Sequence, residues 1–204
     1  MQACPYVLQV SRWDALKDHA GVVSGFAEHV APVCDAHLVC AGPAVEGIGD
    51  DPEGALVLRE VIDVRDRLAA SVRERVHLAV LPMDDPQENG AIVNALQRAA
   101  AVVVQKSIAE GFGLTVAEAM WKARPVVASR VGGIQDQIDD GRCGVLLDDP
   151  RDLGAFGAAV SRLLDRPDEA QALASAAQER VRERFLAPRS LLDYLRLLGA
   201  VARA

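Results

Sequence analysis

The chain has 204 residues, of which 50% are hydrophobic and 25% charged, a composition typical of a globular protein with a substantial core. Its net charge of −7 disfavours nucleic acid or an anionic membrane as a partner, because a dominant basic face recognises both. No apolar run approaches the roughly 20 residues of a membrane span, and the first ten residues do not resemble a signal peptide. We therefore expect a cytoplasmic protein with no membrane span.

The cysteines and histidines indicate no metal centre. Cys4, Cys34, Cys40 and Cys143 show no C-x-x-C or other metal-binding spacing, so they are expected to be buried thiols of a reduced compartment. The four histidines are equally scattered and have no paired carboxylate, which favours structural over catalytic roles.

The first part of the chain alternates short β-type runs with segments of helical periodicity. Strands are predicted at Tyr6–Val10, Ala36–Ala41 and Val76–Leu81, and helices at Gly21–Val30 and Leu56–Ser71. The same alternation continues in the middle of the chain, after a turn-rich connection at Pro82–Asn89. A helix is predicted at Ile92–Ala100 and strands at Ala101–Gln105, Pro125–Ser129 and Gly144–Leu147.

The last quarter of the chain is predicted to be helical from Arg151 onward. Breaks are expected near Pro167 and Pro188, and the final helix is Ser190–Val201. The alternation of β and α elements predicts an α/β fold: a doubly wound, Rossmann-like parallel sheet of about six strands, followed by C-terminal helices. Residues 1–204 are expected to form a single domain.

One stretch, Glu110-Gly-Phe-Gly-Leu-Thr-Val-Ala-Glu118, carries the most specific chemistry. The Gly-Phe-Gly turn is expected to leave the first backbone N–H groups of the following helix free, which makes a seat for phosphate. Two carboxylates beside such a seat suit hydroxyl groups, so a nucleotide-sugar fits this pattern better than a bare nucleotide. The other candidate ligand contacts are Gly111, Phe112, Gly113, Leu114 and Thr115. For the carboxylates alone, the alternative is two ordinary acids flanking a helix.

Arg12 and Lys17 follow the first predicted strand, where a parallel sheet places ligand-binding groups. A planar guanidinium together with an ammonium suits a diphosphate. Standing alone, the pair would be read as surface charges on a loop. Because the Glu110 motif also follows a predicted strand, we expect both groups to reach the same edge of the sheet.

Other nucleotide and hydrolase motifs are missing from the sequence. The first strand is not followed by G-x-G-x-x-G, and neither a G-x-x-x-x-G-K-[ST] loop nor a G-x-S-x-G elbow is present. A nicotinamide site is therefore not expected. Gly132-Gly133 is open to two interpretations, a simple turn or a contact with ligand. Trp13 and Trp121 are interpreted as packing residues.

Three segments together resemble the C-terminal, donor-binding domain of retaining GT-B glycosyltransferases: Ser11-Arg12 with Lys17, the Glu110 to Glu118 pattern, and Pro125-Val-Val-Ala followed by Val131-Gly-Gly-Ile134. Within that family, further residues resemble the trehalose synthase branch, which couples nucleotide-activated glucose to free glucose. These segments are Asp51-Pro-Glu-Gly54, Val93 to Ala100 and Val103-Val-Gln-Lys-Ser107.

The resemblance implies a role for each matching residue. Arg12 and Lys17 would hold the donor diphosphate, Glu110 the hydroxyls of the donor sugar, and Glu118 the ribose hydroxyls. Gly113, Leu114 and Thr115 would offer backbone N–H groups, and Lys106 would add positive charge beside the site. The implied donor is a nucleoside diphosphate glucose, with UDP or ADP as its nucleotide, and neither metal nor cofactor is implied.

A complete GT-B enzyme also has an N-terminal domain that binds the acceptor, and that domain is absent from this chain. We expect the chain to bind a donor but not to catalyse transfer alone, and to need an N-terminal GT-B domain in cis or trans. The final helix would then expose Leu191, Leu195 or Leu198. The alternative is a non-catalytic nucleotide-sugar-binding or interaction module, or the subunit of a split enzyme.

Overall fold

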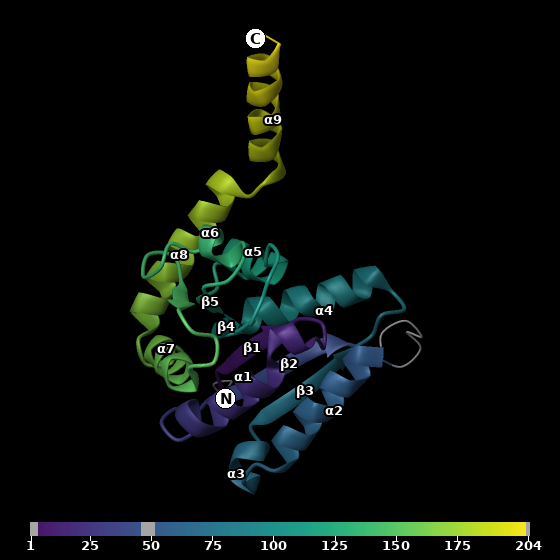
Figure 1. The fold of residues 1–204 in the computed structure, drawn as a ribbon. Helices are drawn as coiled ribbons and strands as arrows, with labels where there is room; N and C mark the ends of the chain where they lie inside the picture. Colours follow the sequence, from purple (N-terminus) through teal and green to yellow (C-terminus); the bar gives the residue numbers. More distant parts are fainter. Residues whose placement is uncertain (1–3, 46–51, 203–204) are drawn as a thin grey trace.

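The computed structural model describes residues 4–45 and 52–202, and the segment that begins Asp51-Pro-Glu-Gly54 therefore lies partly outside the described residues. Strands alternate with helices along most of the chain (Figure 1). The strands are β1 (Tyr6–Val10), β2 (His37–Pro43), β3 (Val76–Leu81), β4 (Val102–Gln105), β5 (Val126–Ser129) and β6 (Val145–Leu147). The helices are α1 (His19–Gly25), α2 (Pro52–Asp66), α3 (Ala70–Arg73), α4 (Pro86–Ala99), α5 (Leu114–Trp121), α6 (Ile134–Gln137), α7 (Leu153–Asp165), α8 (Pro167–Arg184) and α9 (Ala187–Val201). A 3-10 turn, η1 (Ala15–Lys17), precedes α1, and a π-helical turn, η2 (Phe26–Val30), extends it.

The six strands form one sheet in the order β3-β2-β1-β4-β5-β6, and every pairing is parallel. This confirms the predicted doubly wound fold. The order reverses between β1 and β4, where Val7 pairs with Val102 and Leu8 with Val103. Ligands of such sheets bind in the crevice at the carboxyl ends of the two strands that flank this point. The topology therefore directs attention to the loops after β1 and β4.

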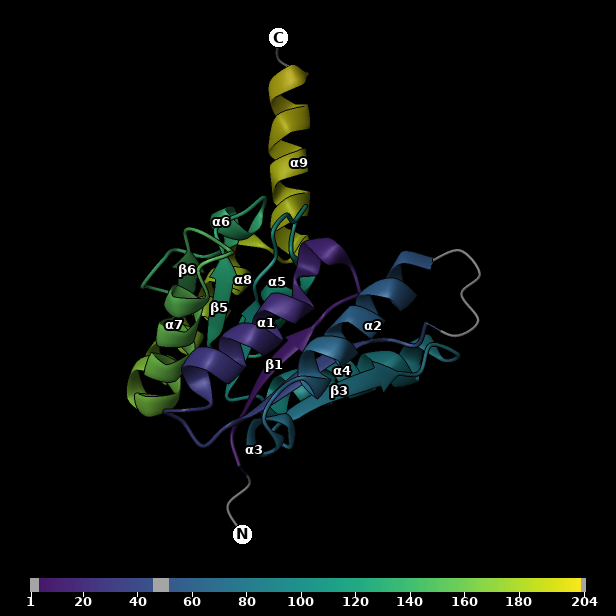
Figure 2. The ribbon, with the colours of Figure 1, turned by 60° about the horizontal axis from the view of Figure 1, so that its bottom comes forward.

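Helices cover both faces of the sheet (Figure 2). On one face α1 lies between α2 and α7, and on the other face α5 packs against α8. Each face has its own apolar core, and the buried strand residues alternate between them: Val7 belongs to one cluster and Leu8 to the other. Because β4 and β5 are buried on both faces, they read as uninterrupted apolar runs.

Some helix boundaries differ from the sequence-based prediction. The connection predicted at Pro82–Asn89 is shorter, because Asp85 caps α4 by accepting hydrogen bonds from the backbone N–H groups of Gln87 and Glu88, and Pro86 occupies the first turn. The single helix predicted at Leu56–Ser71 is divided into α2 and α3. The one-turn helix α6 was not predicted.

The terminal helix α9 extends away from the body of the molecule (Figure 1). None of its described side chains is buried, and its exposed apolar residues include Leu191, Leu195 and Leu198, as expected. Among the described residues, no helix combines the length and the apolar character needed to cross a membrane.

Two predictions about individual residues were only half right. Trp13 is buried and donates its indole N–H to the Pro43 carbonyl over 2.8 Å, whereas Trp121 is 43% exposed at the end of α5. Of the cysteines, Cys40 is buried, as is Cys143, but Cys4 is exposed and Cys34 is partly exposed. Residue type alone does not specify whether a side chain is buried, and Cys4 and Cys34 both lie outside the helices and strands.

Candidate functional site

The loops after β1 and β4 meet at the switch point of the sheet and enclose an open cavity of about 380 Å³. Its lining unites seven of the nine residues predicted from the sequence with two that were not predicted. The lining residues are Ser11, Arg12, Lys17, Gln105, Glu110, Phe112, Gly113, Leu114 and Thr115. The structure thus brings together groups from two motifs that lie about 90 residues apart.

The Gly-Phe-Gly turn forms the N-terminal end of α5. Gly113 is the N-cap residue and has a φ of 86°, a backbone conformation that glycine adopts without strain. A Cβ at this position would lie 2.8 Å from Ile134 Cγ1. Among the described residues, no acceptor pairs with the backbone N–H of Leu114 or Thr115. These two donors lie at the positive end of the helix dipole and on the cavity, where they can bind an anion.

Gly132 and Gly133 support this turn from behind. The N–H of Gly133 donates to the Gly111 carbonyl over 2.7 Å. A Cβ on Gly132, which has a φ of 50°, would overlap the Glu110 carbonyl oxygen. Of the two interpretations left open by the sequence, the structure favours a structural one, since neither glycine lines the cavity.

Gln137 holds the same turn from α6. It is fully buried, and its Nε2 donates to the Phe112 carbonyl. Its own backbone carbonyl accepts a hydrogen bond of 2.5 Å from Arg180 Nε on α8. A chain of contacts therefore runs from α8 through α6 to the edge of the cavity.

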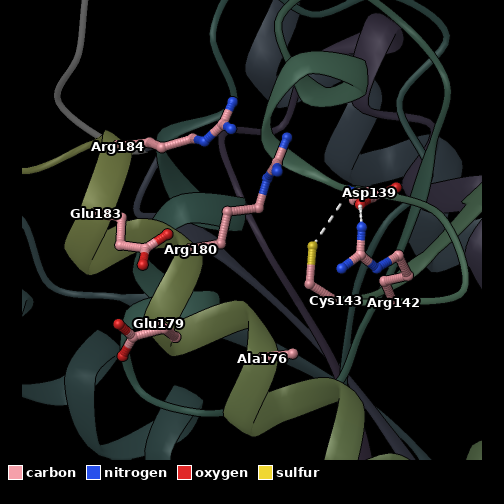
Figure 3. A pocket seen from close by; sticks show the side chains of 8 residues that line it. All are labelled: Asp139, Arg142, Cys143, Ala176, Glu179, Arg180, Glu183 and Arg184. Carbon is pink, nitrogen blue, oxygen red and sulfur yellow. Dashed lines mark hydrogen bonds and ion pairs between the residues drawn. The ribbon is translucent and has the colours of Figure 1, made fainter.

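Arg180 also lines a second cavity, of about 310 Å³, between α8 and the turn that follows α6 (Figure 3). Arginine and acidic side chains are mixed around it, and Arg142 pairs with Asp139 at 3.0 Å. Arg180 additionally donates to the Asp136 carbonyl over 2.9 Å. Because Arg180 already serves as a cap for α6, we interpret this cavity as part of the support for the Gly-Phe-Gly turn.

Lys17 and Glu110 form an ion pair inside the first cavity. Lys17 Nζ lies 2.6 Å from Glu110 Oε2, and the two side chains are 14% and 13% exposed. The backbone of Lys17 is fixed by Gln9 Nε2, which donates to its carbonyl over 2.8 Å. The pair places one cation and one anion beside the free N–H groups of α5.

Arg12 is the more exposed of the two predicted cations. Its side chain is 69% exposed, and it pairs with Asp14 at 3.1 Å at the mouth of the cavity. An exposed pair of this kind is weak, on the order of 0–1 kcal/mol. Arg12 can therefore exchange Asp14 for a bound anion at little cost.

Glu118 and Gly111 do not line the cavity. Glu118 is exposed on α5 one turn beyond Leu114, on the same side of the helix. Its Oε2 lies 3.4 Å from Gln97 Nε2, and Gln97 Oε1 accepts a 2.5 Å hydrogen bond from Lys122. The pKa of Lys122 is lowered by partial burial, and the nearby Glu118 acts in the opposite direction. Glu118 thus lies one helical turn beyond the start of α5, outside the cavity lining.

Sequence reasoning missed Gln105 and Ser11 as cavity residues. Gln105 ends β4 and accepts a 2.9 Å hydrogen bond from the Thr115 hydroxyl through its Oε1, so it ties the strand to the helix. A polar residue at the end of an otherwise apolar strand was the signal that could have identified it. Ser11 Oγ lies 2.9 Å from His19 Nε2.

His19 lies behind the site rather than in it. It is 1% exposed, its ring packs against Trp13 with centroids 4.7 Å apart, and burial lowers its pKa to about 4 from 6.5. A hydrogen bond to the Arg12 carbonyl opposes that shift but does not outweigh it. His19 is therefore neutral at pH 7 and supports the loop that carries Arg12.

Lys106 does not line the cavity either. The resemblance implied that Lys106 would add positive charge beside the site, but its side chain is 1% exposed and paired with Asp18.

A doubly wound parallel sheet with two cations and an open helix N-terminus at its switch point defines an α/β domain with a candidate anion-binding site. The chain belongs to the family described as glycosyl transferases group 1, whose match covers residues 4–180.

Its curated relatives include two trehalose synthases. The protein of Rubrobacter xylanophilus is 42% identical over 196 residues, and that of Thermococcus litoralis is 35% identical over 199 residues. Each match covers 96% of this chain but only 43% and 44% of the respective relative. The chain thus spans less than half the length of these proteins. The matches confirm the resemblance to the trehalose synthase branch.

Solved structures agree on the fold. The sucrose-phosphate synthase of Thermosynechococcus elongatus has a TM-score of 0.76 at 28% identity, and the match covers 98% of this chain and 46% of that one. Anabaena Alr3699/HepE, in complex with UDP-glucose, has a TM-score of 0.73 at 22% identity, with coverage of 97% and 49%.

Proposed function

We propose that the chain binds a nucleoside diphosphate glucose at the switch point of its sheet and forms the donor side of a retaining glycosyltransferase. The observation that carries the proposal is the Lys17–Glu110 ion pair beside the free N–H groups of Leu114 and Thr115. A cation, a carboxylate and a helix N-terminus in one cavity match the diphosphate and hydroxyl groups of such a donor. The complex of Anabaena Alr3699/HepE with UDP-glucose supports the assignment of ligand class.

Donor binding would replace the Lys17–Glu110 ion pair by separate contacts of each residue with the donor. The diphosphate would bind Lys17, Arg12 and the two backbone N–H groups of Leu114 and Thr115. Each of these groups would donate a charge-assisted hydrogen bond. Glu110, released from Lys17, accepts hydrogen bonds from the glucose hydroxyls. Glu118, on the next turn of α5, would accept hydrogen bonds from the ribose.

The same groups would stabilise the leaving group during transfer. Negative charge grows on the departing diphosphate, and a site that already presents cations and N–H dipoles towards it lowers the barrier. Glu110 then positions the sugar rather than forming a covalent bond. In a front-side transfer the acceptor lies on the same face as the phosphate, so the α-configuration is retained. Neither a metal nor a cofactor has a role in this proposal.

The acceptor side would come from an N-terminal GT-B domain, in cis or in trans. By analogy with the trehalose synthases, the proposed acceptor is glucose and the product is trehalose. Alone, the chain should bind donor without transferring sugar, because acceptor positioning and exclusion of water need a second wall. The apolar stripe of α9 offers a surface on which such a domain could pack.

Calorimetric titration of the purified chain with UDP-glucose, ADP-glucose and GDP-glucose tests the proposal. At least one donor should bind with a 1:1 stoichiometry, with UDP- or ADP-glucose expected, and the Lys17→Met variant should bind it at least tenfold more weakly. A matched variant, Arg151→Met, removes an exposed cation remote from the cavity and should bind as the parent does. Absence of binding to every donor would overturn the proposal.

A second experiment separates transfer from simple binding. Mixed with the N-terminal half of a trehalose synthase, the chain should form α,α-trehalose from donor and glucose, as detected by NMR. Binding without any transfer after stable association would instead favour the non-catalytic module.

A further inference from the structure

A second ion pair, between Asp18 and Lys106, joins the two loops of the site. Asp18 directly follows Lys17, which belongs to the first pair. Asp18 Oδ2 contacts Lys106 Nζ, just as the neighbouring Lys17 contacts Glu110. The polarity is reversed: in the first pair the loop after β1 supplies the cation, and in the second it supplies the anion. Adjacent residues of one loop thus hold the other loop through opposite charges.

The two pairs differ in their access to a ligand. Lys17 and Glu110 line the cavity, whereas Lys106 is 1% exposed and absent from the lining. A buried ammonium without a partner is strongly unfavourable, so Lys106, which is 1% exposed, remains paired with Asp18, whose side chain is 19% exposed. A ligand in the cavity competes for Lys17, but it does not reach Lys106.

Asp18 divides its carboxylate between two tasks. Oδ1 accepts a 3.1 Å hydrogen bond from the Gly21 N–H and caps α1, and Oδ2 accepts from Lys106. Its backbone is left-handed, with a φ of 50°, which is uncommon for a residue other than glycine and is tolerated best by Asp and Asn. Such a conformation persists when surrounding contacts enforce it, and it sets the direction in which Lys17 leaves the loop.

We propose that the Lys106–Asp18 pair is a permanent clamp that positions Lys17 for the donor diphosphate, whereas the Lys17–Glu110 pair is the exchangeable one. Lys106 is then a positioning residue that acts through Lys17 and touches no ligand. This inference rests on the proposed function. A 2.8 Å hydrogen bond from the Ile108 N–H to the Leu16 carbonyl ties the same two loops and continues the clamp.

A double-mutant cycle tests the proposal, with UDP and ADP as probes in calorimetry. Lys106→Met should weaken binding of the nucleoside diphosphate by about tenfold in the parent chain and by less than twofold in a Lys17→Met background. If the two substitutions acted independently, Lys106→Met would weaken binding by the same factor in both backgrounds. That result would overturn the proposal. A loss of global stability alone does not produce this coupling when the variants are measured well below their unfolding temperatures.

A second variant guards against a failure of Lys106→Met to fold. Asp18→Asn keeps an acceptor for the Gly21 N–H and tolerates the left-handed backbone, but it removes the charge that Lys106 requires. It should show the same coupling to Lys17→Met.

Hydrogen exchange tests the clamp without any donor, so its outcome is independent of the proposed function. The amide of Lys17, which donates to the Asp14 carbonyl over 2.9 Å, should exchange at least tenfold faster in Lys106→Met or Asp18→Asn than in the parent chain. Amides of β5 serve as the internal reference and should be unchanged. Unchanged exchange at Lys17 in both variants would overturn the clamp, whereas failure of every nucleotide to bind would overturn only the proposed function.

Discussion

Lys17 Nζ lies 2.6 Å from Glu110 Oε2, although 93 residues separate the two in the chain. The sequence pattern assigned them to different parts of one ligand, and the structure shows that without ligand they contact each other. Each neutralises the other, and both side chains are largely buried. An anion that enters must replace a carboxylate already bound to Lys17, so the site favours ligands that also satisfy Glu110.

Charge-neutral variants of this pair should separate recognition of the diphosphate from recognition of the sugar. Lys17→Met should weaken binding of free nucleoside diphosphate and of nucleotide-glucose alike. The expected loss of binding free energy is roughly 1.5–3 kcal/mol, as for hydrogen bonds to charged groups. Glu110→Gln should weaken binding of nucleotide-glucose, because the amide keeps only one acceptor oxygen for the sugar hydroxyls. It should not weaken binding of free nucleoside diphosphate, because it removes the carboxylate that competes for Lys17. Calorimetry with both ligands measures the two effects.

Glu60→Gln changes an exposed acid on α2 that does not line the donor cavity, so it is the control for Glu110→Gln and should leave both affinities unchanged. If Glu110→Gln weakens the binding of both ligands equally, the division of roles between Lys17 and Glu110 is wrong.

Donor affinity and transfer should not depend on a divalent metal. Arg12, Lys17 and the N–H groups of Leu114 and Thr115 already face the place proposed for the diphosphate. We expect the dissociation constant for nucleotide-glucose to agree within twofold in excess chelator and in millimolar Mg²⁺. The reconstituted enzyme should likewise keep its rate, and abolition of transfer by chelation would refute metal independence.

Stability should fall on mild acidification because of His19. Burial lowers its folded-state pKa to about 4, so between pH 4 and the unfolded value near 6.5 the unfolded chain binds the extra proton. The stabilisation is therefore complete above pH 6.5 and is lost as the pH falls towards 4. Between pH 7 and pH 5, His19 should account for a loss of about 2 kcal/mol in the free energy of unfolding.

Urea denaturation at the two pH values measures this loss, and the variant His19→Gln should show a pH difference smaller by that amount. The control variant His29→Gln changes an exposed ring on η2 and should retain the parent pH difference. An undiminished pH difference in the His19 variant would show that another group is responsible.

The apolar residues of α9 should contribute little to the stability of this chain. Leu195→Ser and Leu198→Ser replace side chains that are 57% and 63% exposed, so each should change the free energy of unfolding by less than about 0.5 kcal/mol. By contrast, Leu173→Ala on α8 removes a buried side chain and should cost about 2–5 kcal/mol. Chemical denaturation compares the three.

The α9 variants should instead impair association with a separately produced N-terminal domain, which sedimentation or calorimetry can follow. Normal association of the double variant would exclude α9 from the interface.

The architecture was predictable because its signals are local. Each strand is a short apolar run, and the connection after β4 carries the Gly-Phe-Gly turn and the paired acids within nine residues. Helix ends were less accurate: α4 begins at Pro86 because Asp85 caps it, a signal overlooked among the other turn-forming residues.

The contacts that organise the site depend on three-dimensional packing and could not be read from spacing. Lys106 was expected to add charge beside the ligand, but it is 1% exposed and paired with Asp18. Gln137 gave no signal at all, since nothing in its local sequence indicates that α6 packs against the Gly-Phe-Gly turn. Glu118 was expected to contact ribose, which remains a prediction; it is exposed on α5 and does not belong to the cavity lining.

The close approach of Gly132 to the Glu110 carbonyl separates two kinds of intolerance to mutation. In a library selected only for folding, every residue larger than glycine at position 132 should be depleted, because a Cβ there meets rigid backbone. Gly111 is different, since a Cβ there would meet nothing within 4 Å. Depletion at position 111 should emerge only when the same library is selected for donor binding. Two glycines that look alike in the sequence would thus be maintained by different selective pressures.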